Sequence, residues 1–407
     1  MKVLTIIALI ALVQTTQAQE QIKQPSVEQP QQPNIEQPQQ PNIEQSQQQT
    51  TTTQEQTKKT IELPQWMKDI KFSGYGILQY QSEDKEGDSH NEFNLRLLRL
   101  ILDGKIGDFA WRAQIQTTSN AGPGNPTVML YDLYGEWVKF KELRVRAGQF
   151  KRPFTFDNPS HPITQGWYSY AIAVNALSGG GDRTGEKASG GRDIGIQLQG
   201  DLFPNSNGRS LLHYQIGVFN GEGINQKDKD SKKDLIGGLW VMPIEGLRIG
   251  AFGWTGTRAD MIVGTYTDPT TGKVVNKLAS LCKNRYALSI EYDKDEYLLR
   301  AEYIHSQGWG SGKPNDNTVN YALDDKADGW YASAIVPVIK SKLHVKARYQ
   351  AYRDNKQWNR MKTMYEVGFN YFFYKNLQLN FEYARMNDRT AKKHNYNFFD
   401  VELAFRF

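Results

Sequence analysis

Basic side chains are concentrated in one short stretch of the chain, residues 144–152. Arg144, Arg146, Lys151 and Arg152 all lie there. A guanidinium group binds phosphate or carboxylate through two parallel hydrogen bonds, and an ammonium group acts as a compact positive charge. The chemistry that this stretch offers is therefore the binding of small anions.

Four more basic residues are candidates for the same role: Arg112, Arg183, Lys187 and Arg192. Three of these lie in or beside residues 153–191, where nearby acids offset them: Asp182, Glu186 and Asp193. Tyr168 and Tyr170 carry hydroxyl groups that can donate hydrogen bonds to an anion, although packing of their rings is the simpler interpretation. Glycines give the segment enough backbone freedom to fold back on itself.

Motifs for catalysis or metal binding are weak. Residues 308–313 resemble a phosphate-binding loop, but Gln307 stands where its first glycine is needed and Pro314 where Ser or Thr binds magnesium. His305 and Ser306 cannot act as a pair, because neighbours on a strand point to opposite faces. The six histidines show no metal-ligand spacing. We therefore expect a protein that is not an enzyme and has no metal site and no cofactor.

The elements that position these residues are expected to be strands. Along residues 397–407, one parity is apolar: Phe399, Val401, Leu403, Phe405 and Phe407. The other parity carries Asp400, Glu402 and Arg406. This period of two describes a strand with lipid or a core on one side and polar contents on the other. An aromatic last residue on such a strand is typical of bacterial outer-membrane barrels.

The same pattern predicts sixteen strands in residues 70–407. They are residues 70–81, 92–103, 108–117, 128–140, 142–152, 192–201, 211–220, 234–243, 246–257, 283–294, 296–306, 328–338, 341–353, 361–373, 376–387 and 396–407. Short turns alternate with longer connections, such as 153–191 and 258–282. This alternation is typical of a transmembrane antiparallel β-barrel in the outer membrane. We therefore predict an all-β fold, with the barrel domain over residues 64–407.

The first 63 residues differ in composition from the rest. Residues 1–18 have a basic start, an apolar stretch and small residues before Ala18, which predicts a cleaved signal peptide. Residues 19–63 are rich in Gln and Pro and contain a repeated octapeptide, so we expect a disordered periplasmic segment. This segment is either a tether or, more simply, a solvated spacer. The net charge of +5 is too small for a nucleic-acid-binding field, so we expect no nucleic-acid partner.

Sixteen strands leave an aqueous channel inside a barrel. By parity, ten basic residues face inward: Arg96, Arg112, Arg144, Arg146, Arg248, Arg285, Arg300, Lys346, Arg348 and Arg406. Eight acids share the interior: Asp132, Glu136, Glu291, Glu302, Glu366, Glu382, Asp400 and Glu402. This small excess of basic over acidic residues gives a weak electric field across the barrel wall, and many of these charges can pair with one another. The candidates beside residues 153–191 are therefore the stronger ones.

Several motifs carry a resemblance to a known family. Arg146-Ala-Gly-Gln-Phe-Lys-Arg-Pro-Phe154 resembles a strand of the phosphate-selective porin O and P family, and residues 191–200 resemble the strand that follows its long loop. Residues 93–99, 218–221, 301–304 and 329–331 match further segments in the same order. The resemblance implies a trimeric outer-membrane porin, in contact with lipid, whose long loop 153–191 narrows an anion-selective channel. Phosphate selectivity is implied by this resemblance and does not follow from the residues themselves.

Two alternatives remain open at this point. One is a general or oligosaccharide-permeable porin, and the other is a barrel that serves as a structural or interaction platform without selective transport. A wide lumen favours a channel, because an anchor does not need one.

Overall fold

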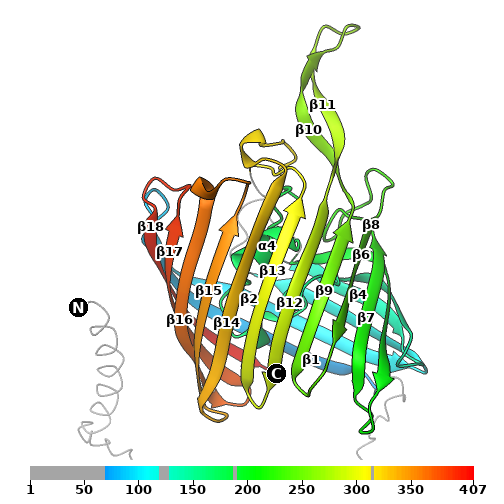
Figure 1. Cartoon of the computed structure of the whole chain (residues 1–407), viewed down its shortest axis with the longest axis vertical. Helices are drawn as coiled ribbons and strands as arrows, with labels where there is room; N and C mark the ends of the chain where they lie inside the picture. The colour runs from blue at the N-terminus through cyan, green and yellow to red at the C-terminus, as the bar shows by residue number, and fades with distance from the viewer. Residues whose placement is uncertain (1–68, 119–127, 187–189, 313–315) are drawn as a thin grey trace, which may run out of the picture. The chain divides into compact units, whose positions relative to one another are not determined.

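The computed structural model describes residues 69–118, 128–186, 190–312 and 316–407; the predicted signal peptide, the Gln/Pro-rich segment and Lys187 lie outside these ranges. The described chain forms a closed antiparallel barrel of sixteen strands, in which β1 pairs with β18 (Figure 1). The barrel strands are β1 (Lys71–Glu83), β2 (His90–Ile106), β3 (Phe109–Thr117), β4 (Val128–Trp137), β5 (Arg144–Lys151), β6 (Arg192–Pro204), β7 (Ser210–Phe219), β8 (Asp234–Val241), β9 (Leu247–Thr255), β12 (Asn284–Lys294), β13 (Tyr297–Gln307), β14 (Lys326–Ile339), β15 (Leu343–Arg353), β16 (Met361–Tyr374), β17 (Leu377–Asp388) and β18 (Asn395–Arg406).

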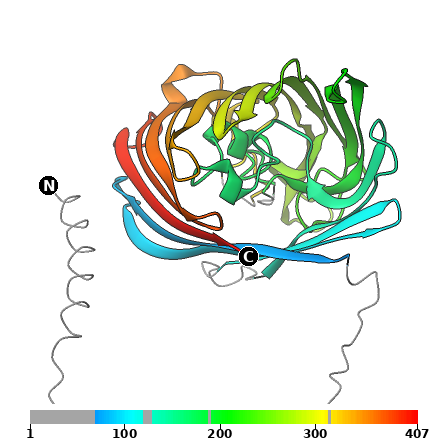
Figure 2. The ribbon, with the colours of Figure 1, turned by 90° about the horizontal axis from the view of Figure 1, so that it is seen from below.

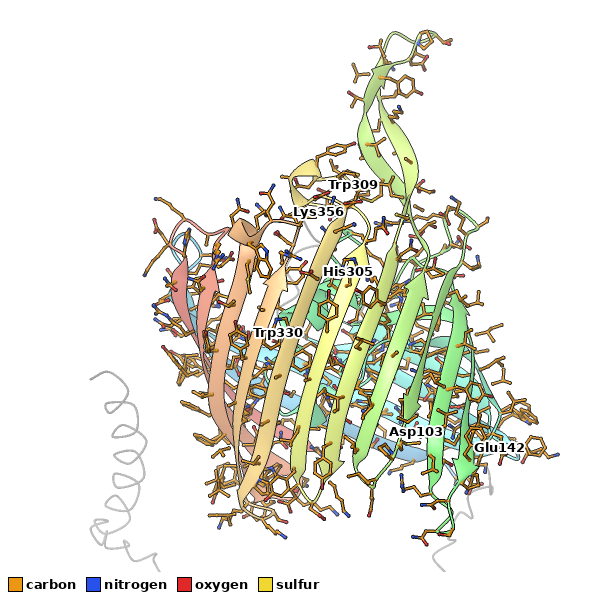
Figure 3. The ribbon with its side chains drawn as sticks, in the orientation of Figure 1. Asp103, Glu142, His305, Trp309, Trp330 and Lys356 are labelled. Atoms are coloured by element: carbon orange, nitrogen blue, oxygen red, sulfur yellow. The ribbon has the colours of Figure 1, made fainter. Side chains whose placement is uncertain are left out.

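Side chains alternate between the outside and the inside of the barrel, as the period of two predicts. In β8, for example, Leu235 and Leu239 are exposed on the outer face, whereas Asp234 and Ile236 are buried inside. Trp330 likewise lies on the outer face (Figure 3). An apolar outer band around a polar interior is the arrangement that lipid requires of a barrel. No helix in the described ranges is long and apolar enough to cross a membrane.

The two ends of the barrel differ in the length of their connections. One end, here called the short-turn end, has tight turns such as residues 107–108 and 295–296. The other, the long-loop end, has extended connections with the short helices η2 (Tyr321–Leu323) and η3 (Trp358–Arg360). Asp103 and Glu142 lie at the short-turn end, and Trp309 and Lys356 lie at the other (Figure 3). The predicted count of sixteen barrel strands and the predicted alternation of connections are both confirmed.

One predicted loop contains additional strands. Residues 258–282 include most of a two-stranded hairpin, β10 (Thr257–Thr267) and β11 (Val274–Cys282), which stands apart from the barrel sheet at the long-loop end (Figure 1). β9 therefore pairs directly with β12. The hairpin lacks the wholly apolar face of a membrane strand, since Thr265 and Asn276 form one of its pairs and Gly264 and Lys277 form another. For this reason the membrane-strand pattern missed it.

An extra residue in β2 changes which side chains enter the barrel. Ile77 pairs with Leu97 but Leu78 pairs with Leu95, so Arg96 is a bulge residue without a partner position in β1. A bulge shifts the parity of the residues beyond it. As a result both Arg96 and Arg99 point inward, and Arg99 is only 5% exposed.

Candidate functional site

The described part of the connection between β5 and β6 folds into the barrel; we call residues 152–186 and 190–191 the inward loop. It carries the short helices α3 (Pro162–Gln165) and α4 (Ile172–Leu177), which lie within the ring of strands when the barrel is viewed along its axis (Figure 2). The carbonyl group of Gly166, at the end of α3, accepts a 2.6 Å hydrogen bond from the inward-pointing Lys346, which confirms this position. The loop therefore fills part of the lumen.

Inward-facing side chains hold this loop against one side of the wall. Three of them accept hydrogen bonds from loop N–H groups: Glu302 from Phe156 at 2.5 Å, Glu382 from Tyr168 at 2.7 Å and Gln350 from Ile172 at 2.7 Å. Arg348 donates to the carbonyl of Ser169 at 3.0 Å, and Arg406 donates to that of Ile163 at 3.2 Å. All these wall residues belong to β13, β15, β17 and β18. Toward β3–β9 the loop also touches the wall, where Phe154 and Phe156 meet Phe252 of β9, but an open space remains on this side.

A buried ionic network fixes the two ends of the inward loop. Arg152 has no exposed surface and pairs with Glu186 and with Asp193, the latter at 2.8 Å. Lys283, which lies between β11 and β12, pairs with Glu186 at 2.9 Å. A buried charge is costly unless it is paired and hydrogen-bonded. Arg152 therefore serves to hold the loop.

Asp182 and Arg285 add a second ion pair between the loop and the wall. The carboxylate of Asp182 accepts hydrogen bonds of 2.6 and 2.8 Å from the guanidinium group of Arg285 on β12. Burial by itself raises the pKa of Asp182, but the charge and hydrogen bonds of Arg285 outweigh it and hold this pKa below its ordinary value. Asp182 thus pairs with a cation of the wall, and not with Arg183 beside it in the sequence.

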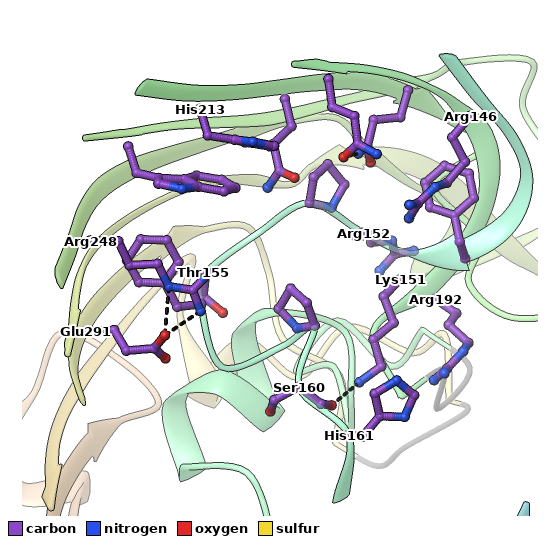
Figure 4. Close-up of a pocket in the computed structure, with 18 of the residues that line it drawn as sticks. Arg146, Lys151, Arg152, Thr155, Ser160, His161, Arg192, His213, Arg248 and Glu291 are labelled. Atoms are coloured by element: carbon purple, nitrogen blue, oxygen red, sulfur yellow. Dashed lines mark hydrogen bonds and ion pairs between the residues drawn. The ribbon is translucent and has the colours of Figure 1, made fainter. Parts of the chain in front are cut away.

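On the open side lies a cavity of about 490 Å³ between residues 152–164 of the loop and strands β3–β9, β12 and β13. Seven cationic side chains border it, against three carboxylates: Asp132, Glu291 and Asp293. The seven cations are Arg112, Arg146, Lys151, Arg152, Arg192, Arg248 and Arg300. Several of their acidic partners lie outside the lining, so the surface that faces the cavity is mainly positive. Figure 4 shows part of this lining.

Three of the predicted basic residues are braced by acids on neighbouring strands. Arg112 binds Asp103 at 2.7 and 3.1 Å, and Arg146 binds Glu136 at 2.7 and 3.1 Å. Arg144 lies outside the cavity lining, nearer the short-turn end, and pairs with Asp201 at 2.8 Å. Pairing reduces the field that each of these guanidinium groups presents to an ion in the lumen.

Lys151 is different, because its ammonium group contacts only neutral acceptors. It donates three hydrogen bonds of 2.7 Å, to the carbonyls of Asn158 and Ser160 and to the hydroxyl of Tyr170. That hydroxyl in turn donates to the Ser160 carbonyl at 2.8 Å, so it accepts from Lys151. Three acceptors match the three protons of a charged ammonium group. Among the described residues no carboxylate forms an ion pair with Lys151.

Arg99 is a second cation of this kind, and the sequence analysis did not include it. It donates to the hydroxyl of Tyr75 and to the side-chain oxygen of Gln116, both at 2.7 Å. Its guanidinium carbon lies 4.8 Å from the ring centre of Tyr131. Within the described ranges it has no acidic partner at ion-pair distance. Strict alternation from Arg96 excludes Arg99 from the interior, and only the bulge in β2 brings it there.

Arg192 and Arg183 lie at different depths. Arg192 is buried, binds Asp132 at 2.6 and 3.1 Å and lies 4.5 Å from the ring of Tyr131, so it shares this ring with Arg99. Arg183 donates to backbone carbonyls of the long-loop connections, including that of Leu323 at 3.0 Å, and is absent from the cavity lining. Arg183 therefore stabilises the loops.

His161 reports the electrostatic environment of the cavity. It belongs to the inward loop, beside the ring of Tyr75. Burial is the largest cause that lowers its pKa, and four surrounding cations add to the effect: Lys151, Arg99, Arg112 and Arg192. Together they lower the pKa of His161 to about 3. His161 is therefore neutral at neutral pH, because burial and the surrounding cations both disfavour a positive charge there.

The two tyrosines of the loop have separate roles. The ring of Tyr168 lies 4.5 Å from that of Phe398 on β18, so it packs against the wall. Tyr170 supplies the hydroxyl that accepts from Lys151. Thus only one of the two hydroxyl groups takes part in the cationic site.

Comparison with known proteins agrees with this architecture. The family described as phosphate-selective porin O and P matches residues 72–237, which include all of β1 except Lys71, strands β2–β7 and the inward loop. Over these residues the chain is similar to the phosphate-selective porin O and P family. With the closed barrel and its apolar outer band, this makes the protein an outer-membrane porin. No curated protein matches the chain.

Solved porins share the fold at low sequence identity. An anion-selective porin from Comamonas acidovorans is 12% identical, covers 83% of this chain and 99% of its own, and has a TM-score of 0.58. OprB of Pseudomonas putida is 11% identical, with 84% and 95% covered and a TM-score of 0.57. OmpT of Vibrio cholerae in a trimer form is 12% identical, with 83% and 99% covered and a TM-score of 0.54. At these identities the similarity establishes the fold alone.

Proposed function

We propose that this porin is a passive channel that prefers small anions, with phosphate among its solutes. The observation that carries the proposal is a pair of cations, Lys151 and Arg99, that have only neutral hydrogen-bond partners among the described residues. Lys151 borders the cavity, and Arg99 lies behind it on the ring of Tyr131, which it shares with the lining residue Arg192. An unpaired cation in a narrow, partly desolvated path attracts anions more strongly than one braced by a carboxylate. The similarity to the phosphate-selective porin O and P family and the fold shared with an anion-selective porin support the same conclusion.

Reversal potentials in planar bilayers test this proposal. With purified full-length protein and a tenfold KCl gradient, we expect a potential of the sign given by chloride permeation, larger at low salt where screening is weaker. Added phosphate is then expected to reduce the chloride current by competition. A cation-selective potential would contradict the proposal and leave a general porin. If the channel is anion-selective but phosphate does not reduce the chloride current, only the part of the proposal that concerns phosphate is contradicted.

We also propose that the protein assembles as a homotrimer. The barrel fold shared with OmpT of Vibrio cholerae, which is described in a trimer form, supports this. Exposed aromatic side chains on several strands suit either a subunit interface or the lipid boundary. Cross-linking in native detergent is expected to give a trimer, and products that stop at the monomer would contradict it.

A further inference from the structure

We infer that the cavity is built for an organic anion, a phosphate ester with a planar ring such as a nucleoside monophosphate, in preference to inorganic phosphate. This inference rests on the proposed anion channel and specifies its solute. Neighbouring strands present three kinds of side chain to the cavity. Cations lie on β5, an amide whose oxygen accepts no hydrogen bond from a described residue lies on β6, and aromatic rings lie on β7 and β8. Because these strands are neighbours in the sheet, the three lie in order around the cavity.

The aromatic part of the cavity is centred on Trp240. Its ring is stacked on that of His213, with centroids 4.1 Å apart and planes inclined by 17°. Phe156 of the inward loop meets Trp240 edge-on at 5.5 Å. Opposite Trp240 in β9 is Gly250, where a Cβ atom would lie only 2.8 Å from the Trp240 Cβ and 3.0 Å from the Phe156 ring. Gly250 thus gives these rings room against the wall.

A cation completes the aromatic part. The guanidinium carbon of Arg248 lies 4.1 Å from the ring centre of Phe156, while Arg248 also binds Glu291 at 2.7 Å. Trp240 is partly exposed and borders the cavity. Planar bases bind to such aromatic and guanidinium surfaces by stacking. Inorganic phosphate has no ring that could stack on this part of the cavity.

The cationic part lies across the cavity. Figure 4 shows Arg146, Lys151 and Arg192 on one side of the cavity, with His213 and Arg248 on the other. The volume of about 490 Å³ is within the range of pockets that enclose small organic molecules. A phosphate group that binds near Lys151 would therefore leave the aromatic part free for the rest of a larger anion.

A buried acceptor lies between the two parts. The amide of Gln197, on β6, is 2% exposed and borders the cavity. Its nitrogen donates to Gln199 at 2.9 Å, whereas its oxygen accepts no hydrogen bond from any described residue. A buried polar atom without a partner is costly unless water or a ligand satisfies it. A sugar hydroxyl is a donor of the required kind, and it lies between phosphate and base in a nucleotide.

Block of the chloride current separates this inference from the proposed function. We expect adenosine monophosphate to halve the current at a concentration on the order of tenfold below that for ribose 5-phosphate, because only the nucleotide has a base to stack. Trp240→Leu is expected to remove most of this difference and leave block by inorganic phosphate unchanged. Trp330→Leu, on the outer face, is the matched control and is expected to behave as the unmodified protein.

The outcomes are distinguishable. Equal block by the nucleotide and ribose 5-phosphate in an anion-selective channel would overturn the inference and leave the proposed function intact. Cation selectivity would defeat both. If Trp240→Leu lacks the heat-modifiable gel migration of a folded barrel, Trp240→Phe tests the same point, because it keeps a smaller ring. The nucleotide is then expected to block Trp240→Phe less strongly than the unmodified protein, but still more strongly than ribose 5-phosphate does. The comparison of blockers on the unmodified protein needs no variant.

Discussion

The ammonium group of Lys151 lies 2.7 Å from the hydroxyl oxygen of Tyr170, and this contact joins the end of β5 to the inward loop. It brings a charged group into the cavity without bringing a carboxylate with it. Most other inward cations are accompanied by an acid, as Arg146 is by Glu136. The selective charge of the channel is therefore expected to be local, at one point on the wall.

Replacing Lys151 tests this expectation. Lys151→Gln keeps a hydrogen-bond donor for the loop carbonyls but removes the charge, so it is expected to lower the ratio of chloride to potassium permeability by a factor on the order of three in dilute salt. Arg144→Gln is the control, since Asp201 already offsets Arg144. Reversal potentials of the two variants at several salt concentrations measure the difference. A larger effect of Arg144→Gln would show that selectivity arises nearer the short-turn end.

The inward loop is expected to depend on buried ion pairs with the wall. Arg348 binds Glu366 at 2.5 and 2.7 Å and also holds the carbonyl of Ser169. Arg348→Met leaves Glu366 buried without its charge partner, which costs about 3–5 kcal/mol. Urea unfolding of the detergent-solubilised barrel, followed by tryptophan fluorescence, measures this loss. An unfolding midpoint equal to that of the unmodified protein would contradict it.

A double variant separates the buried charge from the lost loop contact. Arg348→Met combined with Glu366→Leu removes both charges, so most of the stability is expected to return. The contact with Ser169 stays absent in both variants. A loosened loop is expected to add noise to the single-channel current of both variants. Noise that persists in the double variant, where the stability has returned, would therefore come from the lost loop contact.

His161 gives a prediction for the dependence of stability on pH. Its pKa is about 3 in the folded protein, below the ordinary histidine value near 6.5. The unfolded chain therefore binds a proton that the folded chain does not, and stability falls as the pH is lowered from about 6.5 toward 3. His161→Gln is expected to weaken this dependence by about one proton across that window. Unfolding midpoints at pH 7 and pH 4 measure it, and parallel curves for both proteins would contradict it.

Much of the barrel could be predicted because its pattern is local. Period-two alternation depends on single strands, so it gave β12 and β17 within one residue at each end and the inward direction of Arg146 and Arg248. The short turns could also be predicted, because Asp and Gly residues stand between two successive strand patterns. These features need no knowledge of what a strand contacts.

The cationic site could be predicted only in part, because its details depend on long-range contacts. A single extra residue in β2 brings Arg99 inside, and no pattern within β2 marks Arg96 as a bulge. Arg152 appears in the same basic stretch as Lys151, yet Glu186 and Asp193 enclose it from distant positions. Sequence neighbours thus differ in role because different parts of the fold surround them.

The hairpin β10–β11 supplies a last prediction, because among the described residues its outer part, residues 265–276, pairs only within the hairpin. Tyr266 pairs with Val275 and Gly264 pairs with Lys277, whereas contacts with other loops begin nearer the barrel, where Ile262 bridges to Thr318. Replacing residues 265–276 by a two-residue Asn-Gly turn is therefore expected to preserve the barrel, since such turns join antiparallel strands without strain. The free energy of unfolding is expected to change by no more than about 0.5 kcal/mol, the range of surface substitutions. Chloride conductance and anion preference are expected to stay the same. A loss of heat-modifiable migration would show that the hairpin contributes to barrel assembly, and a change in conductance alone would show that it reaches over the channel entrance.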